Sequence, residues 1–355
     1  MVRPRFFDLD NRYESLSQMG DPLLIKYFLQ TRAVTPLGCG HQPLRIFCVI
    51  VLVFVTMFFT LACSEFGSEK NIKFVSSWGS KGTSDGQFLY IEDFAFDADG
   101  NLLVTDALRS DIQVFSKEGK FLGKFGGKGG KDENLEKPEG VAVDKDGNIY
   151  VADYLSGYIK KYDKSRKHIK TFAGLGDGEG ETIETEFMSI GANDYLYVPE
   201  AGNNRVSVFD LEGNFKFTFG KYGQSDGDMI RPEAAKIDTR ERVYVVDLGN
   251  HRVQIFTPEG KFLEKFGGEG TETGRFRRPT GLAVDKNGDV YVCDMGNNRI
   301  QVFDKDNKFK FAWGEKGAGN GQFGNLHGII IGGDGYVYVA DTANHRIQKF
   351  KILGL

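Results

Sequence analysis

An acidic residue returns six times at a fixed spacing of 47 residues, and this spacing constrains the fold more than any other feature. The six positions are Asp106, Asp153, Glu200, Asp247, Asp294 and Asp341. Two aromatic columns keep the same step: Trp78, Phe125, Phe172, Phe219, Phe266 and Trp313, then Phe115, Tyr162, Phe209, Phe256, Phe303 and Phe350. Three columns in one register indicate a repeat architecture, either a solenoid, a propeller or an array.

Strands fill each repeat. The clearest unit, residues 276–314, contains four short runs rich in Val, Ile, Tyr and Phe, at residues 281–285, 289–294, 299–304 and 308–314. Gly, Asn and Asp bound these runs, and the Asn287-Gly288 pair is typical of a tight hairpin. No run of ten or more residues shows helical spacing, so a helical solenoid fits poorly. Four antiparallel strands in a unit of this length predict an all-β fold built of propeller blades.

The last unit holds only three such runs, at residues 328–332, 336–341 and 346–350. The missing fourth run stands alone at the front of the repeats, at residues 73–79, with Trp78 in the fourth-strand aromatic column. We therefore predict a six-bladed β-propeller of four-stranded antiparallel blades, in which this N-terminal strand closes the last blade. Such closure removes open sheet edges.

Residues 249–256 and 343–350, with the Pro-x-Gly-x-Ala-Val-Asp segments 138–144 and 279–285, closely resemble NHL repeats. The resemblance extends over residues 72–355 and implies the propeller fold. NHL propellers include RNA-binding and protein-binding domains, extracellular sensor domains and an amidating lyase. The resemblance therefore implies no single activity, and function has to be argued from a site.

Residues 46–62 form a charge-free apolar stretch between Arg45 and Cys63. This stretch and the tether at 63–70 resemble a bacterial lipoprotein signal with Cys63 as the lipid carrier, although Thr60 departs from that pattern. The alternative is an uncleaved signal-anchor. Residues 1–45 are longer than an ordinary basic leader, so they are either a true extension or a start assigned too early. Both alternatives predict a propeller at 71–355 that is tethered in the cell envelope outside the cytoplasmic membrane.

Charge and cysteine content limit the function and the redox chemistry. Removing residues 1–62 takes away six basic and four acidic residues, so the net charge of −4 becomes −6. A nucleic-acid-binding domain normally carries a basic surface, so nucleic acid is an unfavoured partner. Cys293 is the one cysteine of the predicted propeller, so no disulfide framework supports it.

One side chain per repeat is predicted to surround the axis, directly before each innermost strand. These six residues, called the inner ring below, are Glu92, Glu139, Glu186, Glu233, Thr280 and His327. Their oxygen-rich set indicates a site for a cationic ligand or a divalent cation, with Ca²⁺ or Mg²⁺ favoured over Zn²⁺. The alternative is that Glu suits the turn and points into a wet channel. In the amidating-lyase relatives this position carries zinc-binding His residues, and the matching trio here, Glu139, Glu233 and His327, has only one imidazole.

Four blades keep an Asn-x-Arg loop, and their arginines are predicted to tie loop carbonyls: Arg205, Arg252, Arg299 and Arg346. Blades one and two depart from this loop. Their Arg109, Tyr154 and Tyr158 are predicted to lie on the same mouth as the inner ring, where Arg and aromatic residues are typical contact anchors. Simple drift of the repeat is the alternative.

These features together predict a monomeric propeller that serves as a binding module. The expected ligand is a protein, peptide or glycan at the mouth, with or without a bound cation. The alternative is a metal-dependent lyase-like or hydrolase-like enzyme that uses Glu139, Glu233 and His327 at the central channel.

Overall fold

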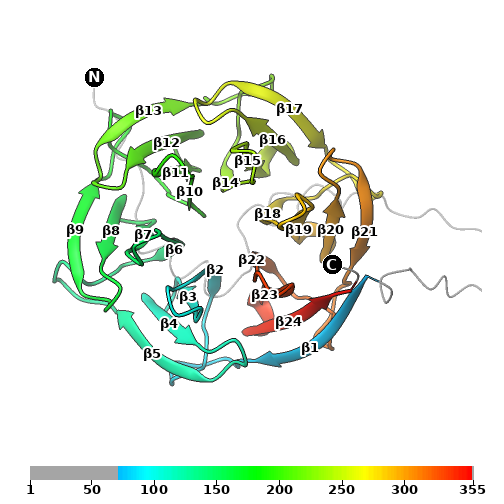
Figure 1. Ribbon diagram of the computed structural model, residues 1–355, viewed down its shortest axis with the longest axis horizontal. Helices are drawn as coiled ribbons and strands as arrows, with labels where there is room; N and C mark the ends of the chain where they lie inside the picture. The colour runs from blue at the N-terminus through cyan, green and yellow to red at the C-terminus, as the bar shows by residue number, and fades with distance from the viewer. Residues whose placement is uncertain (1–70, 354–355) are drawn as a thin grey trace, which may run out of the picture. The chain divides into compact units, whose positions relative to one another are not determined.

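A computed structural model describes residues 71–353, and these form a ring of six four-stranded antiparallel sheets (Figure 1). The predicted signal segment 46–62 and Cys63 lie outside the described residues. Within residues 71–353 no helix is long and apolar enough to cross a membrane. The six sheets confirm the predicted six-bladed ring. The predicted membrane anchor stays a prediction.

The first three blades follow one another along the chain. Blade 1 contains β2 (Ile91–Phe96), β3 (Leu102–Asp106), β4 (Asp111–Phe115) and β5 (Phe121–Gly126); blade 2 contains β6 (Pro138–Val143), β7 (Ile149–Asp153), β8 (Tyr158–Tyr162) and β9 (His168–Ala173); blade 3 contains β10 (Ser189–Ile190), β11 (Tyr195–Glu200), β12 (Arg205–Asp210) and β13 (Phe215–Phe219). In each blade the first strand lies nearest the axis and the fourth lies outermost.

The other three blades complete the ring. Blade 4 contains β14 (Pro232–Ile237), β15 (Val243–Asp247), β16 (Arg252–Phe256) and β17 (Phe262–Gly267); blade 5 contains β18 (Pro279–Val284), β19 (Val290–Asp294), β20 (Arg299–Phe303) and β21 (Phe309–Trp313); blade 6 contains β22 (Leu326–Ile331), β23 (Tyr336–Asp341), β24 (Arg346–Ile352) and β1 (Ile72–Trp78). Three single-turn 3-10 helices follow the second strands of these blades, at Leu248–Asn250, Met295–Asn297 and Thr342–Asn344.

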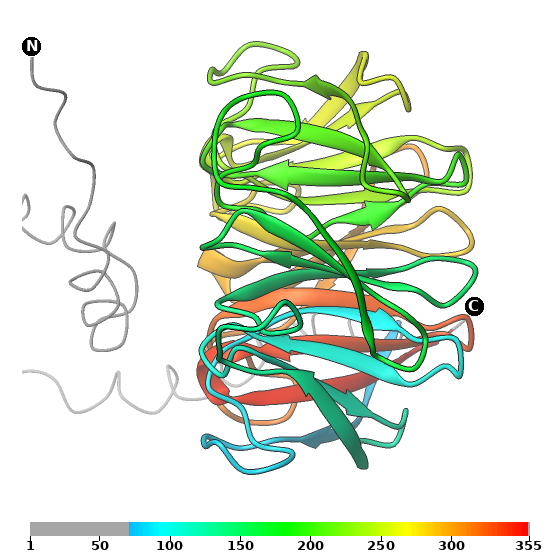
Figure 2. The same cartoon turned by 90° about the vertical axis from the view of Figure 1, so that its left-hand side faces the viewer.

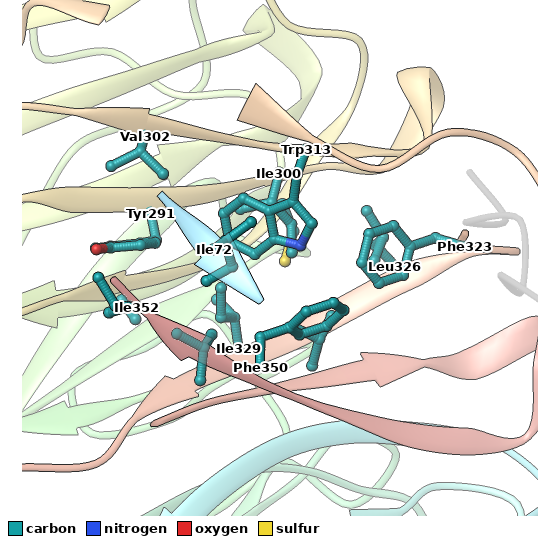
Figure 3. Close-up of a cluster of buried hydrophobic side chains, with 14 of the residues drawn as sticks. Ile72, Tyr291, Ile300, Val302, Trp313, Phe323, Leu326, Ile329, Phe350 and Ile352 are labelled. Carbon is teal, nitrogen blue, oxygen red and sulfur yellow. The ribbon is translucent and has the colours of Figure 1, made fainter. Parts of the chain in front are cut away.

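Strand β1 closes the ring, as predicted. It pairs antiparallel with β24, from Ile72 opposite Ile352 to Trp78 opposite Ile347. Ile72 is buried beside Trp313 in the cluster between blades 5 and 6 (Figure 3). At the other end of β1, the ring of Trp78 packs against Tyr338 and Phe115 of blade 1, with ring centroids 6.1 and 6.3 Å apart. The closing strand thus contributes to two interblade cores.

The core is divided among the blade interfaces, because each sheet buries both faces against its neighbours. Six clusters of buried apolar side chains result, and they are dominated by Val, Ile, Phe and Tyr of the three inner strands. Fourth strands instead alternate between covered and exposed residues, as in β5 and β13. The strands of all six blades run roughly along the ring axis, in alternating directions (Figure 2).

Candidate functional site

The periodic acidic residues hold the loops that lead into the axis. All six are completely buried. Asp106 accepts hydrogen bonds from the backbone N–H groups of Leu89 and Tyr90 at 2.8 and 2.9 Å, and Asp153 accepts those of Glu136 and Lys137 at 3.0 and 2.8 Å. These bonds fix the two residues that enter the innermost strand in blades 1 and 2, and in each of the other four blades one such N–H donates to the periodic carboxylate.

The arginines of blades 3 to 6 complete this arrangement, and their predicted structural role is confirmed. Arg252 donates from Nε to Asp247 at 2.8 Å, and its other nitrogens donate to the carbonyls of Gln224, Ser225 and Asp228. The side-chain amide of Gln254 also donates to Asp247. Burial raises the pKa of Asp247, and these donors oppose that shift by stabilising the carboxylate.

A β-bulge turns the inner-ring residues toward the axis. In β2 the pairing with β3 skips from Ile91 to Phe94, and Glu92 occupies the gap. The same irregularity recurs around Glu139, Glu233, Thr280 and His327. A bulge re-aims a side chain in this way. Five of the inner-ring residues are therefore the second residue of their strand, whereas the sequence analysis placed them directly before it; Glu186 precedes β10.

Glycine lets neighbouring innermost strands approach each other directly after the bulge. A Cβ at Gly140 would lie 2.3 Å from the carbonyl oxygen of Glu186, and one at Gly328 would lie 2.3 Å from that of Glu92. No side chain fits at this distance, which explains the Pro-x-Gly pattern of the repeats. The close approach brings the inner-ring residues of adjacent blades together.

All six predicted inner-ring residues are brought around one axis and are at most 8 % exposed. The His327 Nδ1 atom lies 2.7 Å from the Glu92 carboxyl, and the hydroxyl of Tyr90 lies 3.3 Å from the other imidazole nitrogen. Lys137 forms an ion pair with Glu139 at 2.5 Å. The Thr280 hydroxyl donates to the carbonyl of Leu326 at 3.0 Å, so its polar group serves the backbone.

A second ring, called the outer ring below, precedes the inner ring by two residues in every blade. Its members are Tyr90, Lys137, Glu184, Arg231, Arg278 and Asn325. Arg231 donates to Glu184 at 2.7 Å across a blade boundary, and Asn325 lies 3.3 Å from the His327 imidazole. The sequence analysis missed this ring, although its members share the 47-residue register. Because the residue types differ from blade to blade, no shared side-chain group marks this position in the sequence.

Burial and mutual repulsion shift the pKa values of the acidic inner-ring residues. Burial, and then the nearby Glu139 carboxyl, raise the pKa of Glu92 well above its ordinary value. Burial and Glu233 do the same to the pKa of Glu186. Burial lowers the pKa of His327, although Glu233 opposes that shift. The cluster is therefore short of positive charge.

The remaining predicted mouth residues lie in different surroundings. Arg109 donates to Asp111 at 2.9 and 3.1 Å and to the carbonyls of Ser84 and Gln87, so its guanidinium acts as the loop clamp of blade 1. The ring of Tyr154 lies under the ammonium of Lys137, 3.7 Å from its centroid, and so joins the axial cluster. Tyr158 is 42 % exposed at the start of β8. Their ligand-binding role stays a prediction.

The predicted metal trio does not gather into an ion-binding geometry. Within residues 71–353 no group of three or more His, Cys, Asp and Glu side chains has the arrangement that a metal ion requires. Glu139 is paired with Lys137, and His327 with Glu92. Two of the three residues thus already contact a protein partner, and metal binding by Glu139, Glu233 and His327 stays a prediction.

The repeats match a known family model. The NHL repeat model aligns with residues 135–157, 276–303 and 323–350, which cover parts of blades 2, 5 and 6. Together with the six closed blades, this match decides the family. The chain is an NHL-repeat propeller. No curated protein matches the chain.

Solved propellers share the fold of this NHL propeller at low sequence identity. A virginiamycin B lyase from Staphylococcus aureus is 14% identical with a TM-score of 0.56, over 79% of this chain and 98% of that one. A gluconolactonase from Xanthomonas campestris is 12% identical with a TM-score of 0.58, over 79% and 95%. A protein of unknown function from Bacteroides thetaiotaomicron is 17% identical with a TM-score of 0.60, over 79% and 76%. Similarity at this level shows the fold alone.

Proposed function

We propose that this NHL propeller is a binding module whose mouth receives a cationic group of its ligand. One observation carries the proposal: four glutamates from four successive blades are buried around one axis. Lys137, Arg231 and Arg278 of the outer ring offset only part of their charge. A ligand that brings a positive charge relieves the remaining repulsion, and it replaces the protons that the carboxyls otherwise hold.

The outer ring favours a peptide as the ligand. A basic side chain that enters the axis passes the ring of Tyr90 in the outer ring, and aromatic faces attract ammonium and guanidinium groups. The exposed Tyr158 offers a further apolar contact at a larger radius. A protein loop or peptide with Lys or Arg at its tip fits this sequence of contacts, whereas an anionic or neutral ligand gains nothing from the glutamates.

Calorimetric titration with short probes tests this proposal. We expect Gly-Lys-Gly to bind, Gly-Glu-Gly and a neutral chitotriose not to bind, and Glu186→Gln to weaken Gly-Lys-Gly binding about tenfold or more, because a buried charged hydrogen bond is worth about 2 kcal/mol. Glu259→Gln, which changes an exposed glutamate, serves as the matched control. Preference for the acidic peptide or the glycan, or equal affinity in Glu186→Gln, would rule out the cationic ligand. Parallel titrations with Ca²⁺ and Mg²⁺ test the divalent-cation alternative.

An enzyme is the second candidate, and the contact between His327 and Glu92 favours it. A carboxylate that orients an imidazole, with a phenol on the other nitrogen, is an arrangement suited to proton transfer. Lyase and lactonase activities belong to the solved neighbours named above. Assays with a streptogramin B substrate and with gluconolactone test this candidate. Turnover that His327→Gln abolishes would establish it, and the absence of turnover of either compound would count against it.

We also propose that the propeller works outside the cytoplasmic membrane, tethered through residues 46–62 or a lipid on Cys63. The apolar stretch at residues 46–62 and the Cys63 that follows it support this location. Mass spectrometry of the mature protein is the test. A lipid-modified N-terminal Cys63 is expected, and an intact Met1 in the cytosolic fraction would overturn it.

A further inference from the structure

A second site lies at the opposite end of the axial channel. A cavity of about 230 Å³ is lined by the final residues of the innermost strands, far along each strand from the inner ring. Its walls are mainly apolar and include Phe94, Phe96, Val141, Met188, Ile190 and Ile330. Several of these side chains remain partly accessible, so the cavity opens to solvent.

Two polar side chains interrupt these apolar walls, at one level of the channel. One equivalent position of the repeats contributes to this level of the channel. In the six blades it holds Ala95, Ala142, Ser189, Lys236, Ala283 and Ile330. Ser189 and Lys236 belong to adjacent blades, and both line the cavity. The substitution of a hydroxyl and an ammonium for small apolar groups therefore gives the cavity one polar side.

Both polar groups are incompletely bonded. The Ser189 hydroxyl is buried and has no hydrogen-bond partner. The Lys236 ammonium lies 3.4 Å from a carboxylate oxygen of Asp93 and 3.3 Å from the carbonyl of Met188. A well-formed ammonium–carboxylate bond is about 2.7–2.9 Å long, so these contacts are weak, and the ammonium has three donors to place.

Asp93, across the channel on blade 1, is similarly underbonded. It is 1 % exposed, and one of its carboxylate oxygens has no partner. Buried polar groups in folded proteins are nearly always hydrogen-bonded, so the unpartnered hydroxyl and the weakly held ammonium that line one cavity indicate an absent acceptor.

We propose that this cavity binds a small organic carboxylate with an apolar body. Lys236 and Ser189 donate to the ligand carboxylate, and the Phe, Val, Met and Ile walls cover its body. The volume suits such a molecule, since a protein cavity of about 150 Å³ holds benzene. The long contact to Asp93 means that the ammonium gives up little when it turns toward the ligand.

Titration of the full chain with benzoate, followed by calorimetry and NMR, tests the proposal. Benzoate is expected to bind in a one-to-one complex more tightly than its neutral counterparts benzamide and toluene. Lys236→Met should weaken benzoate binding about tenfold or more and Ser189→Ala several-fold, as for the loss of charged and neutral hydrogen bonds. Lys265→Met, which changes an exposed lysine paired with Asp226, is the control and should bind as the wild type does.

Two further variants keep the test decisive. Lys236→Met leaves the Asp93 carboxylate without its cation, so Asp93→Asn combined with Lys236→Met removes both charges if the single variant does not fold. Ala142→Leu fills the cavity from its wall and should abolish binding. No benzoate binding at millimolar concentrations, equal binding of toluene, or unchanged affinity in Ser189→Ala and the double variant would overturn the proposal. Glu139→Gln should leave benzoate affinity unchanged, which separates this site from the mouth.

Discussion

Arg252 shows how a single side chain supports the fold at the residue scale. Its guanidinium joins the buried Asp247 to three loop carbonyls. Arg252→Met should lower the free energy of unfolding by about 3–5 kcal/mol, because the Asp247 carboxylate is left buried without its cation. Denaturant titration measures this change. Arg240→Met, at a half-exposed arginine, should cost less than 1 kcal/mol; similar losses in both variants would contradict the clamp.

Gly260 lies in the hairpin between β16 and β17 of blade 4 and packs against Phe219, the aromatic-column residue of blade 3. Its φ is +81°, and a Cβ there would lie 2.5 Å from the Phe219 ring. Gly260→Ala should cost about 2–4 kcal/mol through backbone strain and overpacking. Gly274→Ala is the matched control, because Gly274 has φ +80° with nothing within 4 Å; there we expect only about 1 kcal/mol of backbone cost. Thermal unfolding of the two variants separates the clash from the strain.

Some residue roles could not be predicted from the sequence. Arg109 falls outside the Asn-x-Arg register, so the pattern marked it as a free mouth residue, whereas its long side chain reaches the loop carbonyls of blade 1. The acidic inner ring was predictable, because one repeat position carries it. The contact between Glu92 and His327 was not, because it joins blades 1 and 6. The Lys137–Glu139 pair lies within blade 2, but it was missed because the outer-ring column shares no residue type that marks it in the sequence.

Strand β1 decides stability at the scale of the element. Ile72 is 7% exposed within the cluster of Figure 3, and Val75 of the same strand is 43% exposed. Ile72→Ala should lower the free energy of unfolding by about 2–4 kcal/mol, because it leaves a cavity in that cluster. Val75→Ala should change it by less than about 0.5 kcal/mol. If denaturant titrations gave the same loss for Ile72→Ala and Val75→Ala, β1 would contribute no buried side chain that matters for stability. Deletion of residues 71–79 would then be tolerated.

Blade 3 shows where element prediction fails. The predicted four strands are present, but the innermost strand β10 contains only Ser189 and Ile190. The preceding Phe187 bonds to the neighbouring blade instead: its N–H donates to the backbone carbonyl of Glu233 at 3.0 Å, and its carbonyl accepts from the N–H of Ala235 at 2.9 Å. The other strands follow from alternation and turns within one repeat. Pairing across a blade boundary depends on the assembled ring, which local patterns do not contain.

The acidic axis gives the whole molecule a distinctive pH dependence. Burial and neighbouring carboxylates raise the pKa of Glu186 in the folded state. The folded protein then binds this proton more tightly than the unfolded chain, so the stability from Glu186 is present below the unfolded pKa, near 4.3, and is lost as the pH rises through the folded pKa.

Glu186→Gln removes that loss without changing the shape of the side chain. The variant should melt at a higher temperature than the wild type, by a margin that widens as the pH rises from about 5 to about 8. His327 titrates with the opposite sign but is present in both proteins. Glu259→Gln should show no such trend; a margin that is constant or shrinks with pH would contradict the cluster.

The pairing of Ile72 with Ile352 places the two ends of the described chain at the same end of one strand pair. A force that pulls these ends apart therefore loads the β1–β24 hydrogen bonds one after another, by peeling, and never all together in shear. An unzipping geometry yields at low load, and once β1 has peeled away the sixth sheet has an open edge. The ring is thus mechanically weakest at the seam that closes it.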